Sequence, residues 1–313
     1  MQYIFGPIRS RRFGTSLGID LSPALKQCNF DCLYCELAPA ATVDHQSQIA
    51  SVDAIVADLE KALKEHHDID VITVTANGEP TLYPHLDALL ERIDALKGET
   101  KTLILTNSAT LSDPAIFETL LKFDQVKLSL DAVTPEVFKK IDRPHKGIDI
   151  GNIAEAVQHF SKRFRGTLYI EILFVHGLND TDDEIIALND VLMDVHCARI
   201  DIGTIDRPPA YPVEGVSYSE LHAIALQFDP SLPIHIASRQ HAESCVSSYS
   251  EEEILNTLDK RPLTPDDVEL LFDGASKERL AALITRGKVV EKESSGILFY
   301  LPAENIGRKR KKA

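Results

Sequence analysis

The residues that most plainly carry chemistry are three cysteines near the start of the chain. Cys28, Cys32 and Cys35 stand in a C-x3-C-x2-C spacing. Three thiolates on one short loop can bind three irons of a cubane [4Fe–4S] cluster and leave the fourth iron without a protein ligand. Because an open iron can coordinate a small molecule, the spacing predicts an iron–sulfur site that also binds a ligand.

Two other interpretations of the cysteines stay open at this point. A structural zinc site needs a fourth ligand, and the nearest imidazole, His45, has no motif around it. A cluster that only transfers electrons usually has four cysteine ligands. The remaining cysteines, Cys197 and Cys245, stand alone and are expected to be small buried hydrophobic residues.

The elements that must position these cysteines follow a regular order. Helical and strand patterns alternate from residue 50 onward, with helices expected near 51–63, 84–96, 134–140, 149–163 and 182–194 and a short one starting at Pro114. Six strands are expected, at Ser16–Leu21, Val71–Val74, Thr102–Leu105, Val126–Asp131, Leu168–Phe174 and Arg199–Gly203, with a weak candidate at Ile234–Ala237. This order predicts an α/β fold with a parallel sheet in a partial barrel. In such folds ligands bind at the carboxyl ends of the strands.

The last part of the chain has a different pattern. We expect a helix over Glu251–Leu258, a second one capped by Thr264 and a third one capped by Ser276. A hairpin of 289–292 and 297–301 follows, which completes a winged-helix pattern. The predicted domains are therefore 1–249, a barrel, and 250–302, a winged helix. Residues 303–313 form a basic tail that is predicted to be disordered.

Two motifs together resemble the radical S-adenosylmethionine (SAM) superfamily. They are the cysteine loop, with Tyr34 just before its last cysteine, and Gly78, Glu79 and Pro80 after the second strand. The resemblance implies a partial (β/α)6 barrel with a [4Fe–4S] cluster at its mouth and SAM chelated to the open iron. It also implies reductive cleavage of SAM to methionine and a 5′-deoxyadenosyl radical, which abstracts hydrogen from a substrate.

The same resemblance implies roles for individual residues. The three cysteines would ligate the cluster, Tyr34 would lie near the adenine, and Gly78–Pro80 would offer backbone and carboxylate acceptors to the SAM ammonium group. Asn107, Ser129 and Asp131 match polar positions at strand ends, and the last two resemble ribose contacts. Without the cysteines, Ser129 and Asp131 would simply be expected to cap the next helix.

Three further residues, Glu171, His176 and Arg207, fall at or near strand ends and are candidate substrate-facing groups. Within the superfamily the chain is most similar to the branch of wyosine-base tRNA synthases, in residues 18–21, 129–132 and 174–179. Archaeal members of that branch have extra cysteines for a second cluster, and none precedes Cys28 here. A tRNA base and a peptide are the substrates considered, and a low-potential donor such as flavodoxin or ferredoxin is the expected electron partner.

The net charge and its distribution bear on the remaining hypotheses about function. The 313 residues carry a net charge of −15, and because residues 250–313 have 12 basic and 12 acidic side chains, the excess lies in residues 1–249. An acidic body argues against broad nucleic-acid binding. A rival hypothesis is an iron–sulfur redox sensor whose winged helix binds nucleic acid through Lys277, Arg279 and Arg286, but a sensor needs no SAM motif. Without a signal peptide or a long apolar run, the chain is expected to be cytoplasmic and not membrane-bound.

Overall fold

The computed structural model describes residues 2–10, 13–236, 248–260, 262–294 and 297–303. Its centre is one curved sheet of eight strands in the order β1 to β8. The strands are β1 (Ile4–Ser10), β2 (Gly14–Asp20), β3 (Val71–Thr75), β4 (Lys101–Thr106), β5 (Gln125–Ser129), β6 (Thr167–Phe174), β7 (Arg199–Thr204) and β8 (Ile234–Ile236). β1 pairs antiparallel with β2, and every later pair is parallel. The predicted α/β class with a parallel partial barrel is confirmed.

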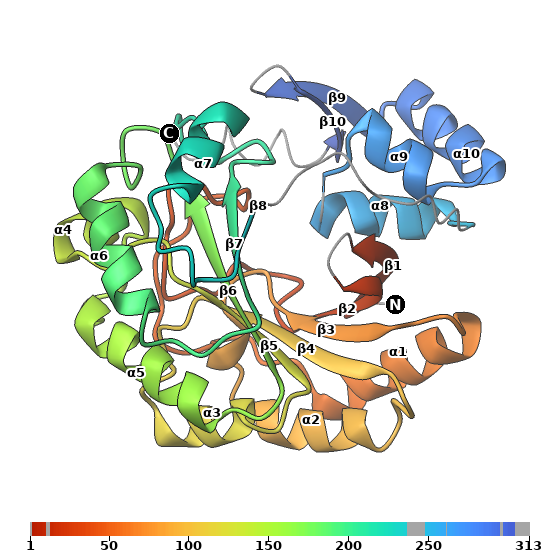
Figure 1. The fold of residues 1–313 in the computed structure, drawn as a ribbon. Coiled ribbons are helices and arrows are strands. Elements are labelled where there is room, and N and C mark those ends of the chain that lie inside the picture. The colour runs from red at the N-terminus through yellow and green to blue at the C-terminus, as the bar shows by residue number, and fades with distance from the viewer. Residues whose placement is uncertain (1, 11–12, 237–247, 261, 295–296, 304–313) are drawn as a thin grey trace.

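Helices cover the convex side of this sheet (Figure 1). They are α1 (Val52–Glu65), the short 3-10 helix η1 (Pro80–Leu82), α2 (Leu86–Asp94), α3 (Pro114–Leu120), α4 (Pro135–Ile141), α5 (Ile150–Arg163), α6 (Asp182–Leu192) and α7 (Tyr218–Ala225). Each longer helix buries one apolar face; in α1 this face holds Ile55, Val56 and Leu59. Burying such a side chain contributes roughly 1.5–3 kcal/mol.

The structure adds elements that the sequence patterns did not predict. β1 was not expected, because Pro7 lies in its middle and proline is tolerated only in edge strands. α7 was also missed, although Ser217 and Glu220 form a capping box at its start. The weak candidate near Ile234 is β8, a three-residue strand paired with β7. The parallel part of the described sheet therefore has one strand more than the six expected.

Alternation along the strands separates the two faces of the sheet. In β6, Leu168, Ile170, Ile172 and Phe174 are buried, whereas the alternate residues are only half-buried. Because successive side chains of a strand point to opposite faces, the buried set packs beneath the helices and the other set lines the concave interior. That interior set includes polar side chains, and Glu171 is one of them.

The last described part of the chain forms a compact module beside β1 (Figure 1). It consists of α8 (Glu251–Lys260), α9 (Pro265–Leu271), α10 (Gly274–Thr285) and a hairpin of β9 (Val289–Ser294) and β10 (Ile297–Pro302). The expected elements are present, while the winged-helix assignment and the domain boundaries stay predictions. The cap of the third helix was placed wrongly: Asp273 accepts a hydrogen bond from Ser276 N, because the helix begins at Gly274.

This module is attached to β1 by both apolar and polar contacts. Ile8 belongs to the same buried cluster as Ile254 and Leu258 of α8. The hydroxyl of Tyr249 donates to the Pro7 carbonyl, and Asn256 Nδ2 donates to the Ile4 carbonyl at 3.0 Å.

Several expectations fall at the edges of what the structure describes. Cys245 and residues 304–313 lie outside the described residues. Cys197, expected to be buried, is half-buried. No helix within the described ranges is long and apolar enough to cross a membrane.

One side chain joins the ends of β5 and β6 and provides a test of this fold. Asn179 is fully buried. Its Nδ2 donates to the carbonyls of Asp131 and Leu173 at 2.8 and 2.9 Å, and its Oδ1 accepts from Val175 N at 2.8 Å.

Asn179→Ala leaves these groups unpaired, and we expect the free energy of unfolding to fall by about 2–4 kcal/mol in urea titrations. The exposed Asn152→Ala should change it by less than about 0.5 kcal/mol. Equal effects of the two changes would contradict this role of Asn179.

Candidate functional site

The cysteine loop follows β2 and is joined to the loop that follows β3. Gln27 N donates to the Asn77 carbonyl, and Glu79 N donates to the Gln27 carbonyl, both at 2.9 Å. Gly78 lies between them with a φ of +135°, and a Cβ at this position would lie 2.0 Å from Gln27 O. Only glycine therefore allows the two loops to approach this closely.

The carboxylate of Glu79 links the end of β4 to these two loops. Its Oε1 accepts from Thr81 N at 3.0 Å, from Thr81 Oγ1 at 2.7 Å and from Thr106 Oγ1 at 2.6 Å. Its Oε2 accepts from Asn107 N at 2.8 Å. Burial raises the pKa of Glu79, although these hydrogen bonds oppose the shift. Since the side chain is only 2% exposed, its oxygens serve these internal donors.

The opposite side of the cysteine loop contacts the last residue of α4 and the residue that follows it. Asp31 N donates to the Asp142 carbonyl at 3.1 Å, and Leu33 N donates to the Ile141 carbonyl at 2.8 Å. The loop after β7 adds a third contact, in which Ala210 N donates to the Cys35 carbonyl at 2.8 Å. The three cysteines therefore stand on a backbone that is hydrogen-bonded on several sides.

The cysteines themselves are free thiols with nitrogen donors close to two of the sulfurs. Lys26 Nζ lies 3.7 Å from Cys35 Sγ, and Asn107 Nδ2 lies 3.8 Å from Cys28 Sγ. Burial raises the pKa of all three thiols, that of Cys28 to about 12. Three thiols and N–H donors on one loop suit a thiolate-ligated cluster, whose binding must displace the thiol protons.

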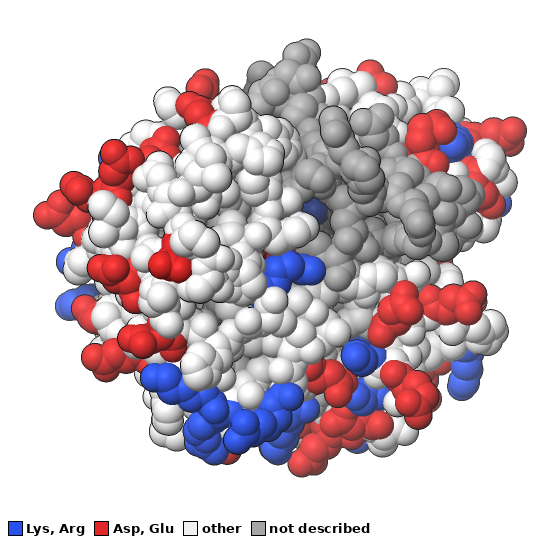
Figure 2. Space-filling view, in the orientation of Figure 1, with Lys and Arg blue, Asp and Glu red and all other residues white. Residues whose placement is uncertain are grey.

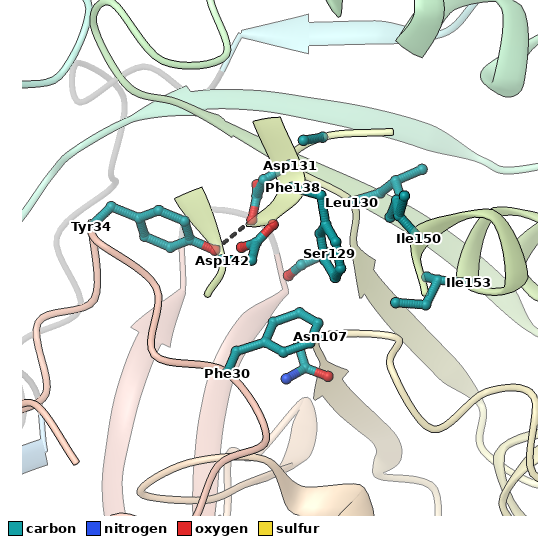
Figure 3. Close-up of a pocket in the computed structure, with 11 residues that line it drawn as sticks. Phe30, Tyr34, Asn107, Ser129, Leu130, Asp131, Phe138, Asp142, Ile150 and Ile153 are labelled. Carbon is teal, nitrogen blue, oxygen red and sulfur yellow. Dashed lines mark hydrogen bonds between the residues drawn. The ribbon is translucent and has the colours of Figure 1, made fainter. Parts of the chain in front are cut away.

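A small pocket opens beside this loop (Figure 3). The Tyr34 hydroxyl donates to Asp131 Oδ2 at its edge, and Asp131 Oδ1 accepts from Leu173 N at 2.6 Å. Ser129 and the Asn107 side chain also line the pocket. The structure thus brings Tyr34 of the cysteine loop together with Asn107 after β4 and with Ser129 and Asp131 at the end of β5, all of which the sequence analysis singled out.

Two buried carboxyl groups, those of Asp131 and Asp142, line this pocket. Burial raises the pKa of Asp131 to about 7, although the hydrogen bond from Tyr34 opposes the shift. The pKa of Asp142 is raised well above its usual value, first by burial and then by the nearby Asp131 charge. The pocket therefore holds carboxyl groups that retain protons at unusually high pH.

The concave interior below the pocket contains charged side chains held in pairs. Lys127 Nζ lies 2.6 Å from Glu171 Oε1. Arg199 Nε lies 2.8 Å from Asp201 Oδ1, and its guanidinium stacks over the Tyr169 ring at 4.8 Å. This interior presents polar groups to anything that enters it.

The three candidate substrate-facing residues therefore have different surroundings. Glu171 lies in the interior. Arg207 contacts Glu36, just after the last cysteine, at 2.6 Å. His176 is an exposed residue 3.4 Å from Asp180, and no described contact connects it to the pocket.

Sequence reasoning missed Lys26, Lys127 and Asp142. Lys26 and Lys127 could have been singled out from their places in the sequence. Lys26 stands two residues before a cysteine, and Lys127 interrupts an apolar strand. Asp142 enters the site through the turn after α4, which no pattern in the sequence connects to the cysteines.

The basic side chains of α10 and that of Arg286, which follows it, have acidic or carbonyl partners in the described C-terminal part of the chain. Lys277 Nζ lies 2.6 Å from Glu269, and Arg286 lies 2.6 Å from Glu251. Arg279 donates to the Tyr249 carbonyl at 2.7 Å. These contacts lend no support to the redox-sensor alternative, which needs this helix to contact phosphates.

The fold and the site together define an open α/β barrel with a three-cysteine loop at its mouth. The family model of the radical SAM superfamily matches residues 23–188. The chain therefore belongs to the radical SAM superfamily, whose members use a [4Fe–4S] cluster and SAM.

The chain is also similar to proteins of known sequence and, in its fold, to solved structures. A "UPF0026 protein" of Helicobacter pylori strain J99 is 36% identical over 299 residues, which cover 95% of this chain and 96% of the relative. A radical SAM methyltransferase from Sphaerobacter thermophilus shares the fold with a TM-score of 0.56 and 14% identity, over 71% of this chain and 65% of that one. TYW1 with a lysine–pyruvate adduct has a TM-score of 0.54 and 15% identity, over 71% of this chain and 76% of that one.

The contact between Gly78 and Gln27 predicts the effect of one methyl group. In Gly78→Ala the added Cβ overlaps the Gln27 carbonyl, and the cysteine loop must move. We expect iron and sulfide per chain after anaerobic reconstitution to fall several-fold. Gly147→Ala is the matched control, because Gly147 also has a positive φ, +94°, but nothing lies within 4 Å of its Cβ position. Equal iron loss in both variants would show that backbone strain alone, about 1–3 kcal/mol, is responsible.

The raised pKa of Asp131 predicts a pH effect on the stability of the metal-free protein. An Asp in an unfolded chain titrates near pH 4, roughly three units below the value of about 7 in the folded protein. The folded protein therefore binds this proton more tightly. The free energy of unfolding should fall as pH rises through this window, by at most about 1.4 kcal/mol per pH unit.

Asp131→Asn should flatten this part of the stability profile, measured by urea unfolding at several pH values between about 4.5 and 7.5. The flattening should be partial, because the pKa of Asp142 is raised as well. A variant profile as steep as that of the wild type would contradict the assignment of this proton to Asp131.

Proposed function

We propose that Cys28, Cys32 and Cys35 ligate a [4Fe–4S] cluster and that the open iron binds SAM. The observation that carries this proposal is the contact of the cysteine loop with the Gly78–Pro80 loop at the carboxyl ends of β2 and β3. When bound, the cluster supplies one electron that cleaves SAM to methionine and a 5′-deoxyadenosyl radical, which takes a hydrogen atom from the substrate.

The residues around the cysteines have distinct parts in this function. The carboxylate of Glu79 serves internal donors, so we assign the contact with the SAM ammonium group to backbone carbonyls of residues 78–80. Glu79 acts by positioning these carbonyls and Asn107. Tyr34, Ser129 and Asp131 line the adjacent pocket, which supports contacts of these side chains with the nucleoside part of SAM.

The substrate is proposed to enter the concave interior, where the charged pair of Lys127 and Glu171 faces it. A polar group, from a tRNA base or a peptide, suits these side chains. Acidic side chains are spread around the face shown in Figure 2, while the basic ones gather mainly along its lower edge. With a net charge of −15, this surface favours the peptide over the tRNA.

A partner must supply the electron. We propose a low-potential donor of the flavodoxin or ferredoxin type. The three cysteine residues are each partly exposed, which supports the approach of a donor to this loop.

The decisive experiment scores 5′-deoxyadenosine after anaerobic reconstitution, dithionite reduction and addition of SAM. The wild type should form it, whereas Cys28→Ala, Cys32→Ala and Cys35→Ala should each reduce its formation to background, because each removes one cluster ligand. A reconstituted wild-type cluster that never cleaves SAM would overturn the proposal.

Cys197→Ala is the control for this set. Cys197 lies just before β7, and parallel strands begin at the end of the barrel opposite to the cysteine loop. This variant should keep wild-type deoxyadenosine formation. A comparable loss in Cys197→Ala would mean that the assay responds to general damage rather than to ligand removal.

A further inference from the structure

A buried lysine lies against the cysteine loop and has no part in the roles assigned above. The Lys26 side chain is 7% exposed, and its Nζ lies 3.7 Å from Cys35 Sγ and 3.6 Å from Asp31 Oδ1. An ammonium group is very seldom buried without an anion that compensates its charge. The groups around Nζ therefore explain why the lysine is placed here.

Asp31 compensates this charge only in part. Its Oδ2 accepts from the Tyr211 hydroxyl at 2.5 Å and lies 3.3 Å from Arg143 Nη1. The distance from Lys26 to the other oxygen exceeds that of an ordinary hydrogen bond. Two cations thus share one carboxylate, and a positive charge is left over beside the sulfur of Cys35.

The neighbouring acidic residue does not remove this excess. Glu36 follows Cys35 directly, but its Oε1 lies 2.6 Å from Arg207 Nη1. The anion best placed to balance Lys26 is therefore Cys35 itself, once its thiol has become a thiolate ligand.

The sulfurs of the loop differ in their surroundings for this reason. Cys35 faces an ammonium group, whereas Cys28 accepts from the backbone N–H of Phe30 at 3.4 Å and faces the neutral amide of Asn107. Cys32 lies near the buried carboxyl group of Asp142. Hydrogen bonds and positive charge at ligand sulfurs stabilise the reduced, more negative state of a cluster.

We propose that Lys26 raises the reduction potential of the cluster through Cys35 Sγ and that Asp31 limits this effect. The inference rests on the proposed function, because it needs the cluster on these cysteines. Reduction adds one electron from the external donor, and the fixed ammonium charge stabilises that electron without a proton transfer. Lys26 thus acts on the cluster indirectly, through the cluster ligand Cys35.

The test is a redox titration of the reconstituted protein without SAM, followed by the electron paramagnetic resonance signal of the reduced cluster. Lys26→Met should lower the midpoint potential, making reduction about tenfold less favourable, which equals about 59 mV for one electron. Lys26→Arg keeps the charge and should stay within about threefold of the wild type. Asp31→Asn keeps an acceptor for Tyr211 but removes the negative charge, so it should raise the potential.

These variants separate the inference from the proposed function. If Lys26→Met has the wild-type midpoint at equal cluster content, the inference is overturned and SAM cleavage by the wild type is untouched. If the wild type forms no [4Fe–4S] signal, both proposals are overturned. Should Lys26→Met hold no cluster, Asp31→Asn decides: a raised midpoint supports the inference, and an unchanged or lowered one overturns it.

Discussion

The mouth of the barrel depends on the close approach of two backbones, at Gln27 and Gly78. Their hydrogen bonds continue the pairing of β2 and β3 beyond the ends of these strands, so the cysteine loop begins as an extension of the sheet. The Gln27 side chain fixes the far end of the same loop, because its Oε1 accepts from the backbone nitrogens of Ser47 and Gln48 at 2.7 and 3.0 Å. A site formed by loops thereby gains the rigidity of a sheet.

Buried carboxyl groups connect further chain segments to this part of the sheet. Glu79 joins the ends of β3 and β4, and Asp131 joins the end of β5 to β6 and to Tyr34. Asp31 gathers Lys26, Arg143 and Tyr211 from three separate segments. An acceptor with two oxygens can satisfy several donors at once, which suits a place where many chain segments end together. The thiols thus lie among buried acids, and Lys26 places a positive charge beside one of them, Cys35.

Local signals predicted the repeating part of the fold and the chemistry of the cysteines. The strands from β2 to β7 are apolar runs between helices with one apolar face, and such patterns need no knowledge of distant residues. β1 was missed because it contains Pro7, and β8 was only a weak candidate because it has three residues, so pairing with a neighbour defines each of them. Tyr34 and Asp131 were identified separately, but their hydrogen bond to each other depends on how the sheet curves. The role of Asp142 arises only from packing, which no spacing rule encodes, and the place of Lys26 near Cys28 in the sequence does not show that its ammonium group lies beside Cys35.

The attachment of the C-terminal module to β1 has a consequence for how the protein folds during its synthesis. The strand that holds Ile8 leaves the ribosome before the rest of the barrel, whereas the helix that covers Ile8 is made after most of the barrel. Domains fold as units during synthesis, at roughly 5–20 residues per second. The outer side of β1 must therefore wait, on the order of ten seconds or more, with an apolar edge open to solvent. A nascent chain that ends before α8 therefore lacks the residues that cover Ile8 in the folded protein.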